Sequence, residues 1–238
     1  MQKYKPKDKP KDKLDIKEIV LLGRTFDEYF LAFNLQDVSL KDGKILDAAS
    51  GVSSFAAEAA MQGINVTGSD RIYSLTASTI ESKCAVDLDY VMAQMPGVAH
   101  LYKWEYFKDV ESLKEVRTRA YKTFIGDFQR QGSSRYVTCE YPKTDFPCNE
   151  FAITLISHFL FLYDDRLNYK FHADTIKECL RITSKEIRIF PIVNLKGELS
   201  PYVKKILSDE AFRHCTKTIH TVDYEFINNG NKMLVISL

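Results

Sequence analysis

The apolar side chains of residues 24–35 recur at the intervals of one face of an α-helix. Phe26, Tyr29, Phe30 and Phe33 lie three or four residues apart along this stretch. The spacing predicts an amphipathic helix whose aromatic side packs against the rest of the protein.

Later in the chain, short apolar runs alternate with longer helical patterns. Strands are predicted at 44–49, 64–69, 135–139, 151–157, 186–193, 219–226 and 232–238, and helices at 55–62, 72–94, 110–128 and 172–182. Alternation at this spacing is typical of a parallel sheet with crossover helices. Between the last two strands, Asn228-Asn229-Gly230 favours a hairpin turn. We therefore predict an α/β fold with a doubly wound, mostly parallel seven-stranded sheet and a C-terminal antiparallel hairpin.

Two regions depart from this alternation. Residues 1–13 repeat Lys-Pro-Lys-Asp and carry six lysines against two aspartates, and their prolines oppose helix and sheet, so we expect a disordered tail. Residues 14–238 are expected to form a single domain. A helical insertion of about 96–134 follows the second crossover helix, and its aromatic stretch 101–107 contains Trp104, the one tryptophan.

Composition narrows the functional classes. The chain has 238 residues, 45% of them hydrophobic, with a net charge of +1, so it can form a core and has no strong overall field. No apolar run approaches the roughly 20 residues of a membrane-spanning helix. We expect a soluble, cytoplasmic protein without a membrane partner, whose basic tail leaves contact with RNA open. The oligomeric state stays open.

Cysteine spacing argues against two kinds of site. The five cysteines are scattered and never form Cys-x-x-Cys, so neither a disulfide framework nor a structural zinc site is expected. No metal is predicted.

The segment after the first predicted strand carries the clearest chemical signal. From Asp47 to Phe55 the residues are mostly small, and the loop leads into a helix whose free amides can bind ligand oxygens. Asp70 ends the second strand, 23 residues after Asp47. A carboxylate at that position can accept both hydroxyls of a ribose that lies across the strand ends.

With these residues, the sequence resembles the class I S-adenosylmethionine-dependent methyltransferases over residues 24–238. Their first motif is an acid followed by three glycines at alternate positions, and this chain has Asp47, Ala49, Gly51 and Ser53 there. Small residues preserve a close approach to the cofactor if the φ angles of Ala49 and Ser53 are negative.

Further landmarks extend the resemblance. The turn Phe146-Pro147-Cys148-Asn149-Glu150-Phe151 is similar to one that precedes strand four in the family, and counting back from it places Glu140 and Tyr141 near the adenine. The resemblance implies binding of S-adenosylmethionine, with S-adenosylhomocysteine as product, and a first helix folded over the cofactor. The implied binding residues are Tyr29, Asp47, Ala48, Ala49, Ser50, Gly51, Ser54, Asp70, Arg71, Ile72, Glu140, Tyr141 and Ser157.

The catalytic residues are not assigned, and His158 is a candidate. It follows the fourth predicted strand, where it could act as a general base, pack structurally or contact the cofactor. The aromatic residues of 101–107 either line an acceptor pocket or anchor the insertion. The expected reaction is in-line attack of an unidentified acceptor, favoured as a small molecule, on the sulfonium methyl group.

Two alternatives remain at this point. One is a methyltransferase-like scaffold that binds without catalysis, which the substitutions at Ala49 and Ser53 favour. The other is a nicotinamide-dependent oxidoreductase, which is disfavoured because no Gly-x-Gly-x-x-Gly occurs in the chain.

Overall fold

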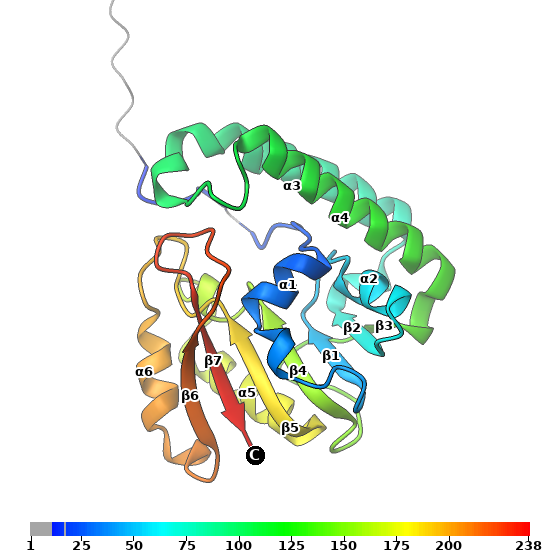
Figure 1. Ribbon diagram of the computed structural model, residues 1–238, viewed down its shortest axis with the longest axis vertical. Helices are drawn as coiled ribbons and strands as arrows, with labels where there is room; N and C mark the ends of the chain where they lie inside the picture. Colours follow the sequence, from blue (N-terminus) through cyan, green and yellow to red (C-terminus); the bar gives the residue numbers. More distant parts are fainter. Residues whose placement is uncertain (1–10, 17) are drawn as a thin grey trace, which may run out of the picture.

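The protein, described here by a computed structural model for residues 11–16 and 18–238, is built on one seven-stranded sheet (Figure 1). The strand order is β3-β2-β1-β4-β5-β7-β6, and β7 alone runs antiparallel to its neighbours. The strands are β1 (Ile45–Ala48), β2 (Val66–Asp70), β3 (Tyr136–Thr138), β4 (Phe151–Ser157), β5 (Thr183–Phe190), β6 (Thr216–Thr221) and β7 (Lys232–Ser237). The predicted fold class is confirmed. Residues 1–10 of the expected tail lie outside the described residues.

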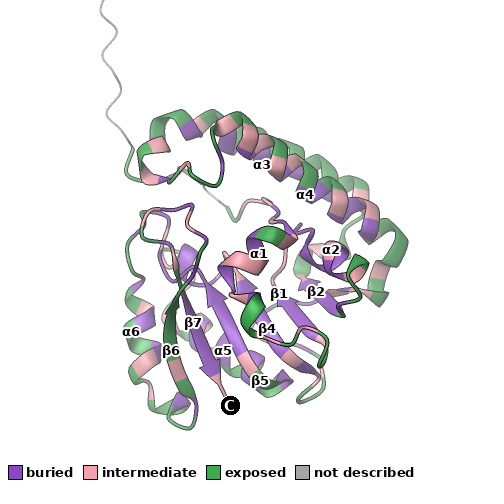
Figure 2. Ribbon diagram, viewed as in Figure 1, coloured by how far each residue is buried: buried purple, intermediate pink, exposed green. Residues whose placement is uncertain are grey.

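Helices cover both faces of the sheet. They are α1 (Phe26–Ala32), α2 (Phe55–Met61), α3 (Ala77–Val98), α4 (Val110–Gln131), α5 (Tyr169–Ile182) and α6 (Pro201–Ser208). Neighbouring residues of β1 point to opposite faces, so Ile45 packs in a core with Phe55 of α2, and Leu46 packs in a core with Ile176 of α5. Figure 2 shows the central strands buried, whereas the edge strand β6 is exposed.

Helices α3 and α4 pack against each other and lie beyond the carboxyl ends of the parallel strands (Figure 1). The loop between them carries the aromatic stretch 101–107 and packs on the connection between β6 and β7. Tyr102 pairs through its backbone with Ile227, and the rings of Tyr102 and Phe107 lie 4.7 and 4.9 Å from the ring of Phe226. Aromatic packing therefore anchors this helical pair to the sheet.

The C-terminal hairpin differs from the prediction in its connection. The last two strands pair as expected, but β6 ends at Thr221, and residues 222–231 form a long loop instead of a short Asn-Gly turn. Tyr224 and Phe226 are buried against the aromatic loop, and Asn228 donates its backbone N–H to the carbonyl of Leu101. Burial of these side chains draws the chain away from the sheet.

The first helix is shorter than the predicted 24–35. Thr25 caps its N-terminus in a reciprocal arrangement with Glu28, and Asn34 adopts a left-handed conformation (φ 45°) just after the helix, before a 3₁₀ turn at Leu35–Asp37. The second crossover helix also begins later than predicted, because Asp70 caps a 3₁₀ turn at Arg71–Ser74 that precedes α3.

A buried ion pair joins three separate parts of the fold. Arg117 of α4 donates two hydrogen bonds, of 2.7 and 2.8 Å, to Glu28 of α1, and the hydroxyl of Tyr224 donates a third at 2.7 Å. The side chains of Arg117 and Glu28 are only 2% and 1% exposed. Burial alone would raise the pKa of Glu28, but the Arg117 guanidinium outweighs this effect and lowers it.

We expect Glu28→Gln to lower the free energy of unfolding by about 3–5 kcal/mol, because it leaves a buried arginine without its counter-charge. The pKa of Glu28 is lowered in the folded protein. Its ionised carboxylate therefore stabilises the fold at pH values above the ordinary pKa of a carboxyl group, and this stabilisation is lost as the pH falls. Urea unfolding should show that the difference in free energy of unfolding between the wild type and Glu28→Gln narrows as the pH falls. The exposed Glu115→Gln serves as control and should change stability by less than about 0.5 kcal/mol; an equal effect of both variants would contradict the role of the pair.

Candidate functional site

A cavity of about 590 Å³ lies at the carboxyl edge of the sheet, beneath α3. The loop after β1 and the ends of β2 and β4 form its floor, and α3, the aromatic loop and the N-terminal residues 14, 16 and 18–22 form its other walls. Its volume lies within the range typical of sites for small molecules.

The loop after β1 approaches the cavity with two left-handed residues. Ala49 has φ 53° and Gly51 has φ 55°, whereas Ser53 keeps a negative angle. The negative φ angle that close approach to the cofactor is expected to require is therefore present at Ser53 and absent at Ala49. Tyr73, which follows β2, fastens the loop through hydrogen bonds of its hydroxyl with the Ser50 hydroxyl (2.5 Å) and the Gly51 carbonyl (2.8 Å).

Asp70 lies directly against this loop. One carboxylate oxygen accepts the backbone N–H of Gly51 at 2.9 Å, and the other accepts that of Ile72 at 3.0 Å. Burial raises the pKa of Asp70, and these backbone donors partly offset the effect. The end of β2 and the loop after β1 therefore meet at one point of the cavity, as the sequence suggested.

Asp47 is buried behind the cavity wall. Its side chain is 1% exposed and accepts a 2.9 Å hydrogen bond from the hydroxyl of Tyr29, which lines the cavity and stacks on Phe55 at 4.4 Å. Burial raises the pKa of Asp47 well above its ordinary value. Ala48 and Ser54 are also buried and do not line the cavity.

The residues expected near the adenine line one end of the cavity. Arg71 and Glu140 approach each other to 3.8 Å with largely exposed side chains, and Ile72 lies beside them along the chain. Tyr141 is buried, and its hydroxyl lies 2.8 Å from the hydroxyl of Ser69. This end therefore combines solvent-exposed charges with a buried aromatic wall.

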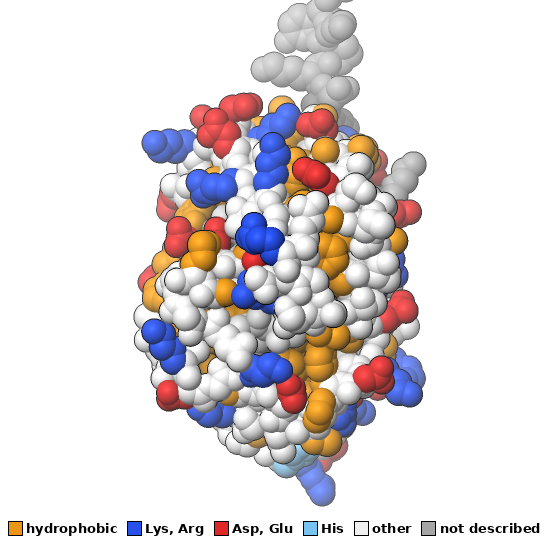
Figure 3. Space-filling model, turned by 90° about the vertical axis from the view of Figure 1, so that its right-hand side faces the viewer, with side chains coloured by type: hydrophobic (Ala, Val, Ile, Leu, Met, Phe, Trp, Pro, Cys, Tyr) orange, Lys and Arg blue, Asp and Glu red, His pale blue; other side chains and the backbone are white. Residues whose placement is uncertain are grey.

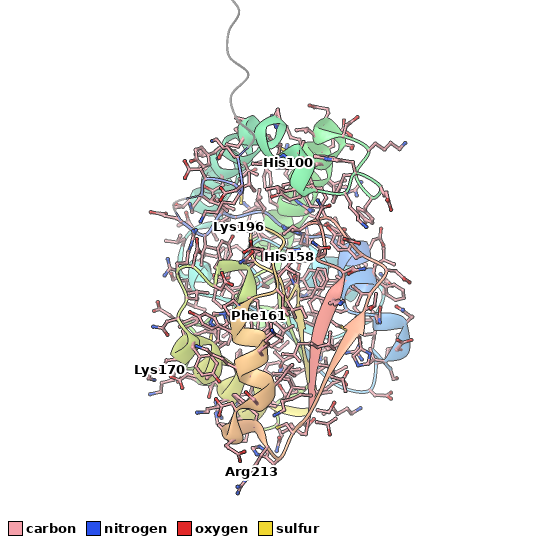
Figure 4. The ribbon with its side chains drawn as sticks, turned by 90° about the vertical axis from the view of Figure 1, so that its left-hand side faces the viewer. His100, His158, Phe161, Lys170, Lys196 and Arg213 are labelled. Carbon is pink, nitrogen blue, oxygen red and sulfur yellow. The ribbon has the colours of Figure 1, made fainter. Side chains whose placement is uncertain are left out.

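His158 follows β4 and lies centrally between the sheet and the helical pair (Figure 4). It has φ 50°, and its Nδ1 lies 2.9 Å from the hydroxyl of Ser157; both residues line the cavity. Burial lowers the pKa of the His158 imidazole well below its usual value, and the charges of Arg24 and Arg117 lower it further. At neutral pH the ring is therefore uncharged, and the same causes make it a weak base.

Several cavity residues were missed by the sequence interpretation. The segment 14–22 was not assigned a role, although Leu14, Ile16 and Leu21 are buried and line the cavity. Arg24 and the α3 residue Met92 also line it. The signal available was the apolar pattern of residues 14–22, directly after the basic tail.

The remainder of the described chain offers few alternative sites. Among residues 11–16 and 18–238, no group of three or more His, Cys, Asp or Glu side chains is placed to hold a metal ion. In the same part of the chain, no helix is long and apolar enough to cross a membrane. Basic and acidic side chains are interspersed on the face shown in Figure 3, so it presents no continuous basic track.

Replacing Ala49 by glycine should raise the free energy of unfolding by about 0.5–1 kcal/mol. An alanine in the left-handed region costs about 1–2 kcal/mol, and the greater flexibility of glycine in the unfolded chain offsets part of the gain. Urea unfolding of Ala49→Gly measures it, with Ala48→Gly as the matched control in the adjacent strand, where glycine should destabilise. A loss of similar size in both variants would show that the loop is not strained at Ala49.

The buried carboxyl group of Asp47 predicts a pH-dependent effect. The pKa of Asp47 is raised in the folded protein. Asp47 therefore has no unfavourable effect on stability at pH values below the ordinary pKa of a carboxyl group, and this destabilisation grows as the pH rises toward the folded-state pKa. Asp47→Asn should therefore stabilise the protein by at least about 1 kcal/mol at about pH 8 and have little effect at about pH 4. Urea unfolding at both values tests this, with the exposed Asp42→Asn as control. A gain that does not depend on pH would refute the explanation.

Comparison with known proteins gives one extensive sequence match. The protein named "Uncharacterized protein MJ0045", from Methanocaldococcus jannaschii, is 50% identical over 224 residues, which cover 94% of this chain and 98% of that protein. No protein-family model matches the chain.

Solved methyltransferase structures resemble the protein at low identity. A SAM-dependent methyltransferase from Aquifex aeolicus is 11% identical, with 88% of this chain and 91% of that chain covered and a TM-score of 0.43. A magnesium protoporphyrin IX methyltransferase from Synechocystis PCC 6803 with bound SAM is 10% identical, with 85% and 73% covered and a TM-score of 0.43. A Methanosarcina mazei SAM-dependent methyltransferase is 12% identical, with 86% and 94% covered and a TM-score of 0.40.

These three similarities are too weak to support a function. The strand order of the sheet, with β7 antiparallel between β5 and β6, is nevertheless the order of the class I methyltransferase fold. Because the identity of 50% extends over nearly the whole length of both proteins, the chain belongs to the same family as the M. jannaschii protein MJ0045.

Proposed function

We propose that the protein transfers the methyl group of S-adenosylmethionine to an acceptor molecule. The observation that carries this proposal is the contact of 2.9 Å between the backbone N–H of Gly51 and the carboxylate of Asp70, at the floor of the cavity. It brings together, in one place, backbone amides and a carboxylate with complementary roles toward a nucleoside.

The space beside this contact fits a cofactor. A Cβ atom added to Gly51 would meet no atom within 4 Å, so the loop borders open space at this residue. Each oxygen of Asp70 accepts one backbone hydrogen bond and retains a further lone pair, which can accept a ribose hydroxyl. Arg71, Ile72 and Glu140 would then flank the adenine, with Tyr141 beside it.

The methionine end of the cofactor would lie toward β1 and β4. Tyr29, which is held by Asp47, and Ser157 line this part of the cavity. Ala48 and Ser54 would support the loop from behind, while Ala49, Ser50 and Gly51 would face the cofactor. Bound S-adenosylmethionine would supply an activated methyl group and leave S-adenosylhomocysteine.

The protein's own part in the reaction would be alignment, exclusion of water and acceptance of a proton. The buried walls of the cavity exclude water from the reacting atoms. Nε2 of the neutral His158 would accept the proton of an acceptor nucleophile, because Nδ1 is engaged with Ser157, and its lowered pKa would make it a weak base in this role. A small-molecule acceptor and a cytoplasmic location remain predictions. Contact of the basic tail with RNA remains open.

A binding module without catalysis is the second candidate. Its support is that Ala49 adopts a left-handed angle in place of the family's glycine, and that both oxygens of Asp70 already have backbone partners. A nicotinamide-dependent enzyme is disfavoured by topology, since the dinucleotide-binding sheet has the parallel order 3-2-1-4-5-6 and lacks an antiparallel strand between its fifth and sixth strands.

Calorimetric titration with S-adenosylmethionine and S-adenosylhomocysteine tests the proposal. Asp70→Asn should weaken the binding of both by at least about tenfold, because charge-assisted bonds to the ribose are lost and one of the two backbone N–H groups, of Gly51 or of Ile72, loses its acceptor. Asp89→Asn, an exposed change on α3, is the matched control and should leave affinity unchanged. Absence of binding by the wild-type protein would refute the function, and unchanged affinity of Asp70→Asn would remove Asp70 from the ribose site.

Catalysis is distinguished from binding alone by a second measurement. Mass spectrometry of small molecules that co-purify with the protein supplies candidate acceptors. Incubation of these acceptors with S-adenosylmethionine should yield S-adenosylhomocysteine with the wild-type protein. A protein that binds the cofactor and yields none of this product with them would be a binding module.

A further inference from the structure

Arg24 is a buried cation that lines the cavity without a full set of partners. It precedes α1, and its side chain is 15% exposed. Nη1 donates to the carbonyl of Leu22, but the buried Nε has no hydrogen-bond partner among the described residues and makes only a long ion pair, of 3.9 Å, with Glu28. Burial lowers the pKa of Arg24, and the charge of Arg117 lowers it further.

The one nearby carboxylate is already engaged. Glu28 accepts two hydrogen bonds from Arg117, one from the hydroxyl of Tyr224 and two from Thr25, through its backbone N–H and its hydroxyl. The buried cluster therefore contains two guanidinium groups and a single carboxylate. One positive charge is left without a counter-charge, which is costly in a buried setting.

Other charged groups of the cavity do not supply that counter-charge. Asp70 and Glu140 lie at the nucleoside end, where they contact Gly51 and Arg71. Lys83 pairs with Asp87. Glu18 lines the cavity but is exposed, and no ion pair joins it to Arg24 in the part of the chain that is described.

The surroundings of Arg24 favour an organic anion. Met92, Met95, Tyr102, Tyr163 and Phe226 line the same cavity, and the two tyrosine hydroxyl groups are the only oxygen or nitrogen groups of these five side chains. A single unmatched positive charge is neutralised by a monoanion, whereas a dianionic phosphate would leave a buried negative charge. A planar guanidinium matches the geometry of a carboxylate.

We propose that Arg24 binds the carboxylate of a ligand in this cavity. Under the proposed function, on which the choice of ligand rests, two sources supply that group: the amino-acid end of the cofactor, or an acidic group on an otherwise apolar methyl acceptor. Both sources share the same chemistry at Arg24, and they differ in which ligand loses affinity when the guanidinium is removed.

Calorimetry with two adenosine ligands separates the sources. S-adenosylhomocysteine carries the carboxylate, and 5′-methylthioadenosine has the same nucleoside without the amino-acid end. If the cofactor supplies the group, Arg24→Met should weaken binding of S-adenosylhomocysteine by about tenfold to a hundredfold and leave 5′-methylthioadenosine unchanged, and Arg24→Lys should recover part of the loss. The control Arg71→Met, at the nucleoside end, should leave the ratio of the two dissociation constants within about twofold.

The second arm tests an acidic acceptor. Benzoate and the uncharged benzamide are compared by thermal shift on the wild-type protein and on Arg24→Met, with and without S-adenosylhomocysteine. If the acceptor supplies the carboxylate, benzoate should raise the melting temperature of the wild-type protein more than benzamide does, and Arg24→Met should abolish this difference.

The two arms decide the inference separately from the proposed function. Failure of both adenosine ligands to bind the wild-type protein would refute the function alone, and the benzoate arm would still decide the role of Arg24. Equal behaviour of the wild type and Arg24→Met with S-adenosylhomocysteine, 5′-methylthioadenosine and benzoate would overturn the carboxylate site. Arg24→Met should fold with an unchanged or higher melting temperature, because it removes an under-paired buried charge.

Discussion

Parallel pairing of β1 with both β2 and β4 is the constraint on which the site depends. The register places Ala48 opposite Ser69 and Ile156, so the three strands end at one edge of the sheet. Parallel strands connected by crossovers must bring their carboxyl ends to the same side, and the segments that follow them therefore meet there. This arrangement brings the loop after β1, Asp70 and His158 into a single cavity.

Features that oppose folding gather around this cavity. Ala49 and His158 adopt left-handed backbone angles, Asp47 is a buried carboxyl group with a raised pKa, and Arg24 lacks a full set of partners. Strain and under-paired polar groups persist where the surrounding structure holds them, and they are concentrated at functional sites in other proteins. Their concentration at one edge of the sheet supports its assignment as the place where the protein binds its ligands.

The roof of the cavity is assembled from parts that are distant in the sequence. Helix α3, the aromatic loop before α4, residues 14, 16 and 18–22, and the β6–β7 connection each contribute to it. Arg117, Glu28 and Tyr224 connect α4, α1 and that connection through buried hydrogen bonds. The shape of the space over the strand ends thus depends on long-range contacts.

The sequence alone determined the order of the strands and of the helices other than α6, because hydrophobic periodicity and small-residue loops are local signals, and the topology rule then placed Asp70 beside the loop at Gly51. It also pointed to His158, which follows a strand of the same sheet edge. Only the tertiary structure decided the left-handed angle of Ala49, the long connection that replaces the expected Asn-Gly turn, and the exposure of Arg24 to the cavity. These depend on side chains far apart in the chain, such as Phe226 against Tyr102 and Arg117 against Glu28, and no local pattern encodes which of them will meet.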